Sequence, residues 1–252
     1  MAESRPNRRF VMEKYCALLT VDAERFSAHR DADLPHLHME IRRALATACT
    51  ACGLAEAWES ARFKESTGDG VLVVLPAETI PALVEPFPTR LQEALAEAAP
   101  GLRARGLRLR LRAALHAGLV DDEREEAPGV SAAAVTVCRL GDSEPLRDAL
   151  TGSDPDVTFV AFLLSDEVFR NHVAAGRTAL HESQFTRVRA VVKQFSEPAH
   201  LRVPVPSAVA VPLPGTEPPV RGGEISISGV TINGRESRNA FGNTVNGDFR
   251  MG

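Results

Sequence analysis

Hydrophobic positions along the chain follow two spacings, one typical of helices and one typical of strands. Leu37, Ile41 and Leu45 recur at helical intervals between residues 34 and 53, which predicts a helix that buries one face. Leucine and arginine alternate between residues 107 and 120, which predicts a strand with one buried face. Because both kinds of segment occur in one continuous stretch, we predict a domain of the α+β class.

The predicted elements follow one another in the order β-α-β-β-α-β and continue with further helices and strands. Strands are predicted at 15–21, 57–64, 71–75, 107–120, 157–164, 185–193 and 200–205. Helices are predicted at 34–53, 80–98 (closed by Pro100-Gly101), 132–140, 145–150 and 165–173. The order, with its antiparallel hairpins, predicts a ferredoxin-like core with extra C-terminal strands, and not a doubly wound parallel sheet.

Composition divides the chain into four segments. A polar, arginine-rich N-terminus at 1–13 precedes the folded domain, which we expect at 14–205. Residues 206–222 are rich in proline and are predicted to form a semi-rigid linker. Residues 223–252 form a tail rich in glycine and asparagine, with no helical pattern.

The composition also limits the classes of protein to which the chain can belong. Its 252 residues are 44% hydrophobic with a net charge of -4, which suits one domain with a full core and gives no general reason to expect nucleic-acid binding. No signal peptide and no apolar run of about 18 residues occurs, so we expect a cytoplasmic protein without a membrane span. Lys14, Lys64 and Lys193 are the only lysines, which makes each of them worth inspecting.

Two aspartates stand beside apolar runs, where strands end or turn. Asp22 follows the first predicted strand, and Asp69 lies in the turn Ser66-Thr-Gly-Asp-Gly70 between two strands. Each alone is typical of an ordinary turn. Brought together, two carboxylates could hold a pair of Mg²⁺ or Mn²⁺ ions and so grip a nucleoside triphosphate. The glycine-rich phosphate loop Gly-x-x-x-x-Gly-Lys-[Ser/Thr] is absent from the sequence.

Four motifs in chain order resemble those of class III nucleotidyl cyclase domains, over residues 15–205. The family carries Asp-x-x-x-Phe-[Ser/Thr] after its first strand, matched by Asp22-Ala-Glu-Arg-Phe-Ser27, and Gly-Asp-Gly in the next hairpin, matched by Gly68-Asp69-Gly70. It carries an arginine on a helix after the fourth strand, matched by Arg139. Near its end it carries a lysine before a turn and a last strand, matched by Lys193.

The resemblance implies a reaction and an assembly. Asp22 and Asp69 would hold two Mg²⁺ or Mn²⁺ ions, and a nucleoside triphosphate would be converted to a 3′,5′-cyclic monophosphate and pyrophosphate. Family members act as head-to-tail homodimers, so Arg139 and Lys193 would reach the site from the other chain. There Arg139 would stabilise the transferring phosphoryl group, and Lys193 would bind the terminal phosphates.

The resemblance leaves the choice of base open. It places the base-reading residue at Glu65; glutamate there accompanies guanine, because a carboxylate accepts the hydrogens of guanine N1 and N2. Lysine accompanies adenine, and Lys64 is one position off, so a bulge would exchange the two roles. The second base-reading position falls at Pro128 and Gly129, which offer no side-chain hydrogen bond. GTP, UTP, CTP and ATP all stay open, with ATP the least favoured.

One position departs from the family pattern and supports a second hypothesis. The asparagine that orients the ribose falls at Val135, or at Thr136 if one residue is deleted; Thr136 offers a hydroxyl and Val135 does not. The first hypothesis is a metal-dependent cyclase in bacterial signalling or antiphage defence. The second is a degenerate cyclase fold that acts as a regulatory or adaptor module.

The sequence of the tail gives two possibilities for a partner protein. It repeats Gly-x-Thr-[Ile/Val]-Asn-Gly at 229–234 and 242–247. It is either a disordered appendage or a short amyloid-type signalling motif, because Gly242-Asn-Thr-Val-Asn-Gly-Asp248 resembles bacterial motifs of that kind. In the second case, residues 223–252 would bind a similar motif in a sensor or effector protein by strand addition.

Overall fold

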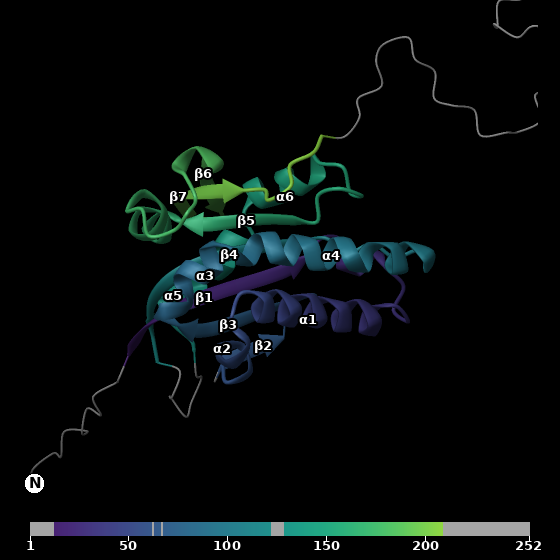
Figure 1. The fold of residues 1–252 in the computed structure, drawn as a ribbon, viewed down its shortest axis with the longest axis horizontal. Helices are drawn as coiled ribbons and strands as arrows, with labels where there is room; N and C mark the ends of the chain where they lie inside the picture. Colours follow the sequence, from purple (N-terminus) through teal and green to yellow (C-terminus); the bar gives the residue numbers. More distant parts are fainter. Residues whose placement is uncertain (1–12, 62, 67, 122–128, 209–252) are drawn as a thin grey trace, which may run out of the picture. The chain divides into compact units, whose positions relative to one another are not determined.

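The computed structural model describes residues 13–61, 63–66, 68–121 and 129–208 (Figure 1). These residues lie in one compact unit that spans Met1–Ala210. The predicted N-terminal segment up to residue 12, most of the linker and the whole tail lie outside the described residues.

The first part of the unit has the predicted β-α-β-β-α-β order. Its main elements are β1 (Lys14–Ala23), α1 (Leu34–Ala51), β2 (Phe63–Ser66), β3 (Gly70–Pro76), α4 (Phe87–Ala104) and β4 (Leu111–Val120). Three more strands complete one seven-stranded sheet: β5 (Val160–Ser165), β6 (Thr186–Val192) and β7 (Phe195–Arg202). The strand order is β2-β3-β1-β4-β5-β7-β6, and every neighbouring pair is antiparallel except β4–β5. The predicted α+β class and ferredoxin-like core are therefore confirmed.

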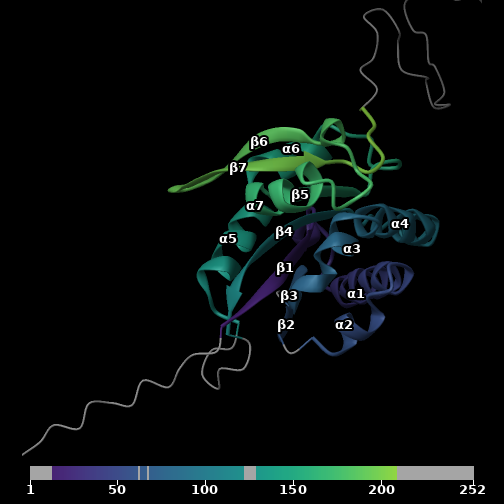
Figure 2. The same ribbon diagram turned by 60° about the vertical axis from the view of Figure 1, so that its left-hand side comes forward.

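Helices cover both faces of the sheet (Figure 2). One face packs against α1, α2 (Ala55–Glu59), α3 (Ile80–Val84), α4 and α7 (Asp166–Val168). The opposite face packs against α5 (Ala132–Gly141) and α6 (Glu144–Thr151). We call this second side the α5 face. In Figure 2, β6 and β7 extend as a two-stranded ribbon past α5 and α7.

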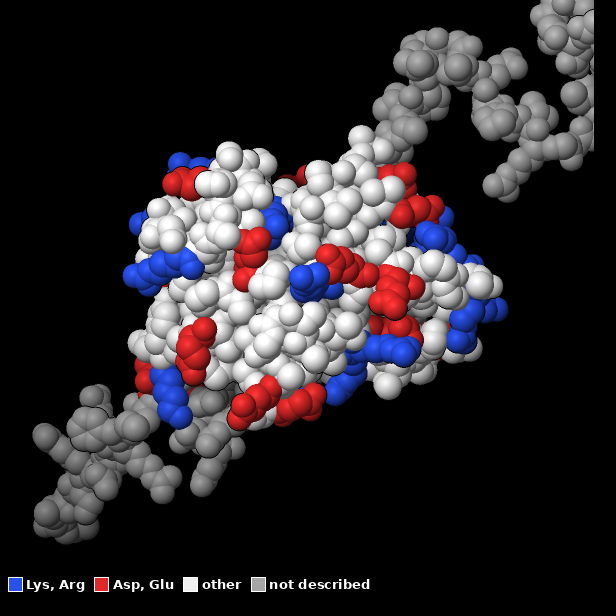
Figure 3. Space-filling view, in the orientation of Figure 1, with Lys and Arg blue, Asp and Glu red and all other residues white. Residues whose placement is uncertain are grey.

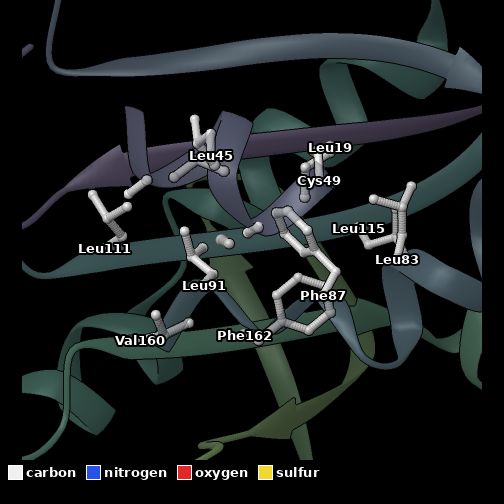
Figure 4. Packing of buried hydrophobic residues seen from close by; sticks show 14 of the residues in the cluster. Leu19, Leu45, Cys49, Leu83, Phe87, Leu91, Leu111, Leu115, Val160 and Phe162 are labelled. Atoms are coloured by element: carbon white, nitrogen blue, oxygen red, sulfur yellow. The ribbon is translucent and has the colours of Figure 1, made fainter. Parts of the chain in front are cut away.

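Large apolar side chains fill the core between the sheet and the longer helices (Figure 4). The rings of Phe87 on α4 and Phe162 on β5 lie 6.5 Å apart at 59°. Leu45 of α1 and Leu91 of α4 are fully buried in the same cluster. Fully burying one such side chain stabilises the fold by about 1.5–3 kcal/mol, so this cluster fixes α1 and α4 on the sheet.

Glycines bring α5 unusually close to the sheet. A Cβ atom at Gly118 of β4 would lie 2.7 Å from Cβ of Ala133, near the start of α5. A Cβ atom at Gly141, the last residue of α5, would lie 2.7 Å from Cγ2 of Thr20 on β1. Both distances are shorter than van der Waals contact, so the helix reaches this position only because the two residues lack side chains.

Two predicted elements differ from the structure near the first hairpin and the second long helix. The predicted strand 57–64 is wrong: Ala55–Glu59 is the helix α2, and β2 begins only at Phe63. The Ala-Glu-Ala-Trp-Glu segment favours a helix, and this helix buries Trp58. The predicted helix 80–98 is two helices, because Pro86 has no N–H to continue the hydrogen-bond ladder between α3 and α4.

Several predicted boundaries also differ. The Pro100-Gly101 pair does not close α4, which continues to Ala104; Pro100 is exposed, whereas Leu102 is buried in the core. The strand predicted from 107 begins at Leu111 and the strand predicted from 157 begins at Val160. The last strand, predicted from 200, already begins at Phe195, because its partner β6 pairs with it from the turn onward.

Candidate functional site

The structure places Asp22 and Asp69 next to each other. Asp22 is the last but one residue of β1 and lies opposite Gly70, the first residue of β3. The backbone N–H of Ala23 donates to the backbone carbonyl of Asp69 at 2.9 Å. The antiparallel pairing of β1 and β3 therefore brings together two aspartates that are separated by 46 positions in the sequence.

A third residue, Arg112 of β4, completes this group. It lies directly opposite Asp22 in the β1–β4 pairing, and its guanidinium forms an ion pair with the Asp22 carboxylate. Its Nε atom is buried and has no hydrogen-bond partner among the residues that the structure describes. Arg112 is not among the site residues predicted from the sequence. The alternation of leucine and arginine places it on one face of a strand, but only the register between β1 and β4 shows that it lies opposite Asp22.

Burial and two neighbouring charges set the protonation of Asp22. The pKa of Asp22 is raised to about 6, chiefly by burial. The positive charge of Arg112 acts against this rise by favouring the carboxylate, and the negative charge of Asp69 contributes to it. Two carboxylates in mutual repulsion, one of them partly desolvated, gain from a nearby divalent cation.

The donor set fits a hard cation. Asp22 and Asp69 supply carboxylate oxygens, the ligands that Mg²⁺ and Mn²⁺ prefer. Within the described residues there is no group of three or more His, Cys, Asp or Glu side chains that could hold a metal ion. Two carboxylates suffice for Mg²⁺, which usually completes its coordination with water and substrate phosphates.

Glu65 and Lys64 point to opposite faces of β2. The Nζ atom of Lys64 lies 4.4 Å from the ring centroid of Trp58, on the face covered by α1 and α2. Glu65 lies opposite Leu72 of β3, which packs on the α5 face. Its charge also acts on Cys138 of α5, whose pKa is raised first by burial and then by Asp142 and Glu65. Glu65 therefore lies on the α5 face and Lys64 does not.

Gly129 packs directly on β2. A Cβ atom there would lie 2.7 Å from the ring of Phe63, and its φ of 73° is in the left-handed region. The predicted second base-reading position at Gly129 thus has no room for a side chain. Pro128, the other residue of that prediction, lies outside the described residues.

Arg139 packs on the β6–β7 hairpin, whose turn contains Lys193. Cζ of Arg139 on α5 lies 5.6 Å from the ring centroid of Phe195, the first residue of β7. Lys193 lies in the tight turn just before it, with a φ of 54°. Within the part of the chain that the structure describes, neither residue forms a hydrogen bond or ion pair with Asp22. Arg139 and Lys193 thus belong to α5 and the β6–β7 turn, whereas Asp22 and Asp69 lie where β1 ends and β3 begins.

The predicted ribose position lies on the same helix as Arg139. Val135 is 46% exposed, and Thr136 is half-buried one turn before Arg139. Residues three and four positions apart share one side of a helix, so both flank Arg139. Only Thr136 carries a polar group.

Comparisons with known proteins show which solved structures share this fold. No protein-family model and no curated protein sequence matches the chain. The structure is similar to that of the guanylyl cyclase Cya2, with 17% identity, a TM-score of 0.53, and coverage of 78% of this chain and 94% of that one. It is also similar to an adenylate cyclase from Trypanosoma brucei, with 15% identity, a TM-score of 0.51, and coverage of 78% and 91%.

These similarities define the class of the fold. The chain has the fold of class III adenylyl and guanylyl cyclase domains, which confirms the predicted cyclase fold. None of the helices among the described residues is long and apolar enough to cross a membrane.

Proposed function

We propose that the domain is a metal-dependent nucleotidyl cyclase that forms a 3′,5′-cyclic nucleoside monophosphate and pyrophosphate from a nucleoside triphosphate. The observation that carries this proposal is the pairing of Asp22 with Asp69 at adjacent strand ends, in a fold similar to adenylyl and guanylyl cyclases. Two aspartates that served only their own turns would not need to meet beside a partly buried arginine that pairs with one of them.

Each residue of the Asp22–Asp69–Arg112 group has a separate role in this proposal. Asp22 and Asp69 hold the divalent ions, which, when bound, favour loss of the ribose 3′-hydroxyl proton and offset the charge of the phosphates. Arg112 favours the ionised form of Asp22, since its charge lowers the pKa of that carboxyl and opposes the effect of burial. The Nε–H of Arg112, which has no hydrogen-bond partner among the described residues, is then available to donate to a phosphate oxygen.

A second copy of the chain completes the site. Arg139 and Lys193 are grouped around the β6–β7 hairpin and make no polar contact with Asp22 in the same chain. In a head-to-tail homodimer, each chain supplies the aspartates of one site and the basic residues of the other. Arg139 stabilises charge on the transferring phosphoryl group, and Lys193 binds the terminal phosphates.

Glu65 is the better candidate for reading the base. It lies on the α5 face, whereas Lys64 stacks on Trp58 on the opposite face. A carboxylate accepts hydrogens from guanine N1 and N2, so GTP is the favoured substrate. Thr136 offers the ribose a hydroxyl.

Product analysis tests the proposal. The full chain is incubated with Mn²⁺ and each of ATP, GTP, CTP and UTP, and cyclic monophosphates are measured by mass spectrometry. We expect product from one nucleotide and its loss in Asp69→Asn, which keeps the side-chain shape but removes the charge. Asp148→Asn, at an exposed position of α6, serves as the matched control and should keep full activity. Undiminished product in Asp69→Asn would refute the metal assignment.

A second function is supported by one observation, the exposed apolar side chain of Val135 at the position predicted to orient the ribose. In that case the domain is a degenerate cyclase fold that binds a nucleotide without turnover and is recruited by residues 223–252 to a sensor or effector protein. Nucleotide binding by a folded dimer, with no cyclic product from any of the four substrates, would favour this function. Either function is compatible with a role in bacterial signalling or antiphage defence.

A further inference from the structure

A cavity of about 520 Å³ opens beside the loop that follows Asp22. Glu24, Arg25 and His29 line it from that loop. Arg108 and Arg110, just before β4, and Ser153, after α6, complete the polar lining that matters here. Its charged lining consists of three arginines and one glutamate. This balance differs from the face drawn in Figure 3, where basic and acidic side chains are interspersed.

Two of these four charges are already satisfied by the protein. Arg110 is buried, and its Nη1 donates to the Glu24 carboxylate at 3.1 Å. Its remaining donors bind the Ser153 hydroxyl at 2.6 Å and two backbone carbonyls. The buried pair is therefore structural and electrically neutral, and the uncompensated charge of the lining belongs to Arg25 and Arg108.

Arg25 has a backbone that does not suit an ordinary side chain. Its φ of 53° and ψ of 31° lie in the left-handed region, where glycine is favoured and other residues are strained. Its guanidinium makes no hydrogen bond or ion pair with any described residue. Strain of this kind persists where the surroundings require it, and it is found most often at functional sites. The chain thus keeps a long cationic side chain where a glycine would relax the loop, and no described residue pairs with its charge.

Arg108 is only partly compensated. It is 55% exposed and lies 3.5 Å from the Asp156 carboxylate, which also binds Arg103 more closely at 3.1 Å. One carboxylate is thus shared by two guanidinium groups. The nearby Asp154 acts on the buried Arg110. A positive charge therefore remains at Arg108, which lines the same cavity as Arg25.

We infer that Arg25 and Arg108 bind a phosphate-type oxyanion in this cavity, separate from the Asp22–Asp69 pair. Guanidinium groups match the geometry of phosphate oxygens, and two of them lining one cavity can each bind one phosphate group of a diphosphate. The anion is either free pyrophosphate or the terminal phosphates of a nucleotide. The site does not depend on the proposed cyclase reaction.

Calorimetric titration of the full chain with pyrophosphate, in buffer freed of divalent metals, tests this site. We expect saturable binding that weakens with added salt, and a loss of about tenfold or more in affinity for Arg25→Gly and for Arg108→Ala. Arg25→Gly is especially informative because glycine relieves the backbone strain and should not harm folding. Arg147→Ala, at an exposed arginine of α6, is the matched control and should bind like the wild type.

Two further measurements sharpen the result. Asp69→Asn removes a proposed metal ligand and should leave pyrophosphate binding intact, so failure of the cyclase proposal and failure of this one are distinguishable. Competition by GTP that is lost in Arg25→Gly would identify the terminal phosphates of a nucleotide as the source, and binding unaffected by GTP would identify free pyrophosphate. The absence of saturable binding in the wild type, or equal affinities for Arg25→Gly and wild type, would overturn the inference.

Discussion

Gly141 tests how closely α5 must approach the sheet. A Cβ atom added there would lie 2.7 Å from Cγ2 of Thr20, about an ångström inside the usual contact distance of two carbon atoms. Overpacking of this kind costs about 1–3 kcal/mol. Alanine returns about 0.5–1 kcal/mol through its better helix propensity. We therefore expect Gly141→Ala to lower the free energy of unfolding by about 1–2 kcal/mol.

A double-mutant cycle isolates the contact. Thr20→Ser removes Cγ2 and keeps the hydroxyl, so it should restore the stability lost in Gly141→Ala, with a coupling energy of about 1–3 kcal/mol in urea unfolding followed by circular dichroism. Gly101→Ala is the matched control, because a Cβ atom at this position of α4 would meet nothing within 4 Å. It should be neutral or stabilising. Additive effects in the cycle, or a stabilised Gly141→Ala, would refute the packing argument.

Three further predictions follow from the ion pairs and the segment boundaries. Asp22 has a native pKa of about 6 against an ordinary 3.8, so the native state holds the extra proton and loses stability as pH rises through this window. Asp22→Asn should be more stable than wild type by about 1–3 kcal/mol at pH 8 and equally stable near pH 4 in urea unfolding, and a pH-independent difference would contradict this. Arg110→Met should destabilise by about 3–5 kcal/mol, since Glu24 is left partly buried without its partner; a loss below about 1 kcal/mol would show that the network contributes little. Deletion of 222–252 should leave one cooperative unfolding transition with an unchanged midpoint, and an insoluble head would show that the tail belongs to the core.

The sequence predicts best the elements whose pattern agrees with their tertiary role. The helical spacing of Leu37, Ile41 and Leu45 predicts α1, and the structure buries all three. The segment around Trp58 is predicted wrongly, because a short segment with only a few apolar residues fits a strand or a helix equally well. Its burial against α1, which no local pattern contains, decides the outcome.

The candidate site could be predicted only in part, for a related reason. Motif order identifies Asp22 and Asp69, but it does not show that Arg112 meets Asp22, because this depends on the register between β1 and β4. Nor does it choose between Glu65 and Lys64. A one-residue shift in a strand exchanges the two faces, so only the pairing of β2 with β3 settles which side chain lies on the α5 face.

The close contact of α5 with the sheet has a consequence for how such a domain can diverge. Gly118 and Gly141 let the two ends of the helix lie close against the sheet, and its buried side chains pack there, so the helix position depends little on its outward side chains. Substitutions at exposed positions such as Val135 and Arg139 therefore change the chemistry presented by the helix without moving it. In evolutionary terms, the glycines that the packing of α5 requires are different residues from the exposed ones that can be substituted freely. An active cyclase and an inactive descendant can therefore share one fold.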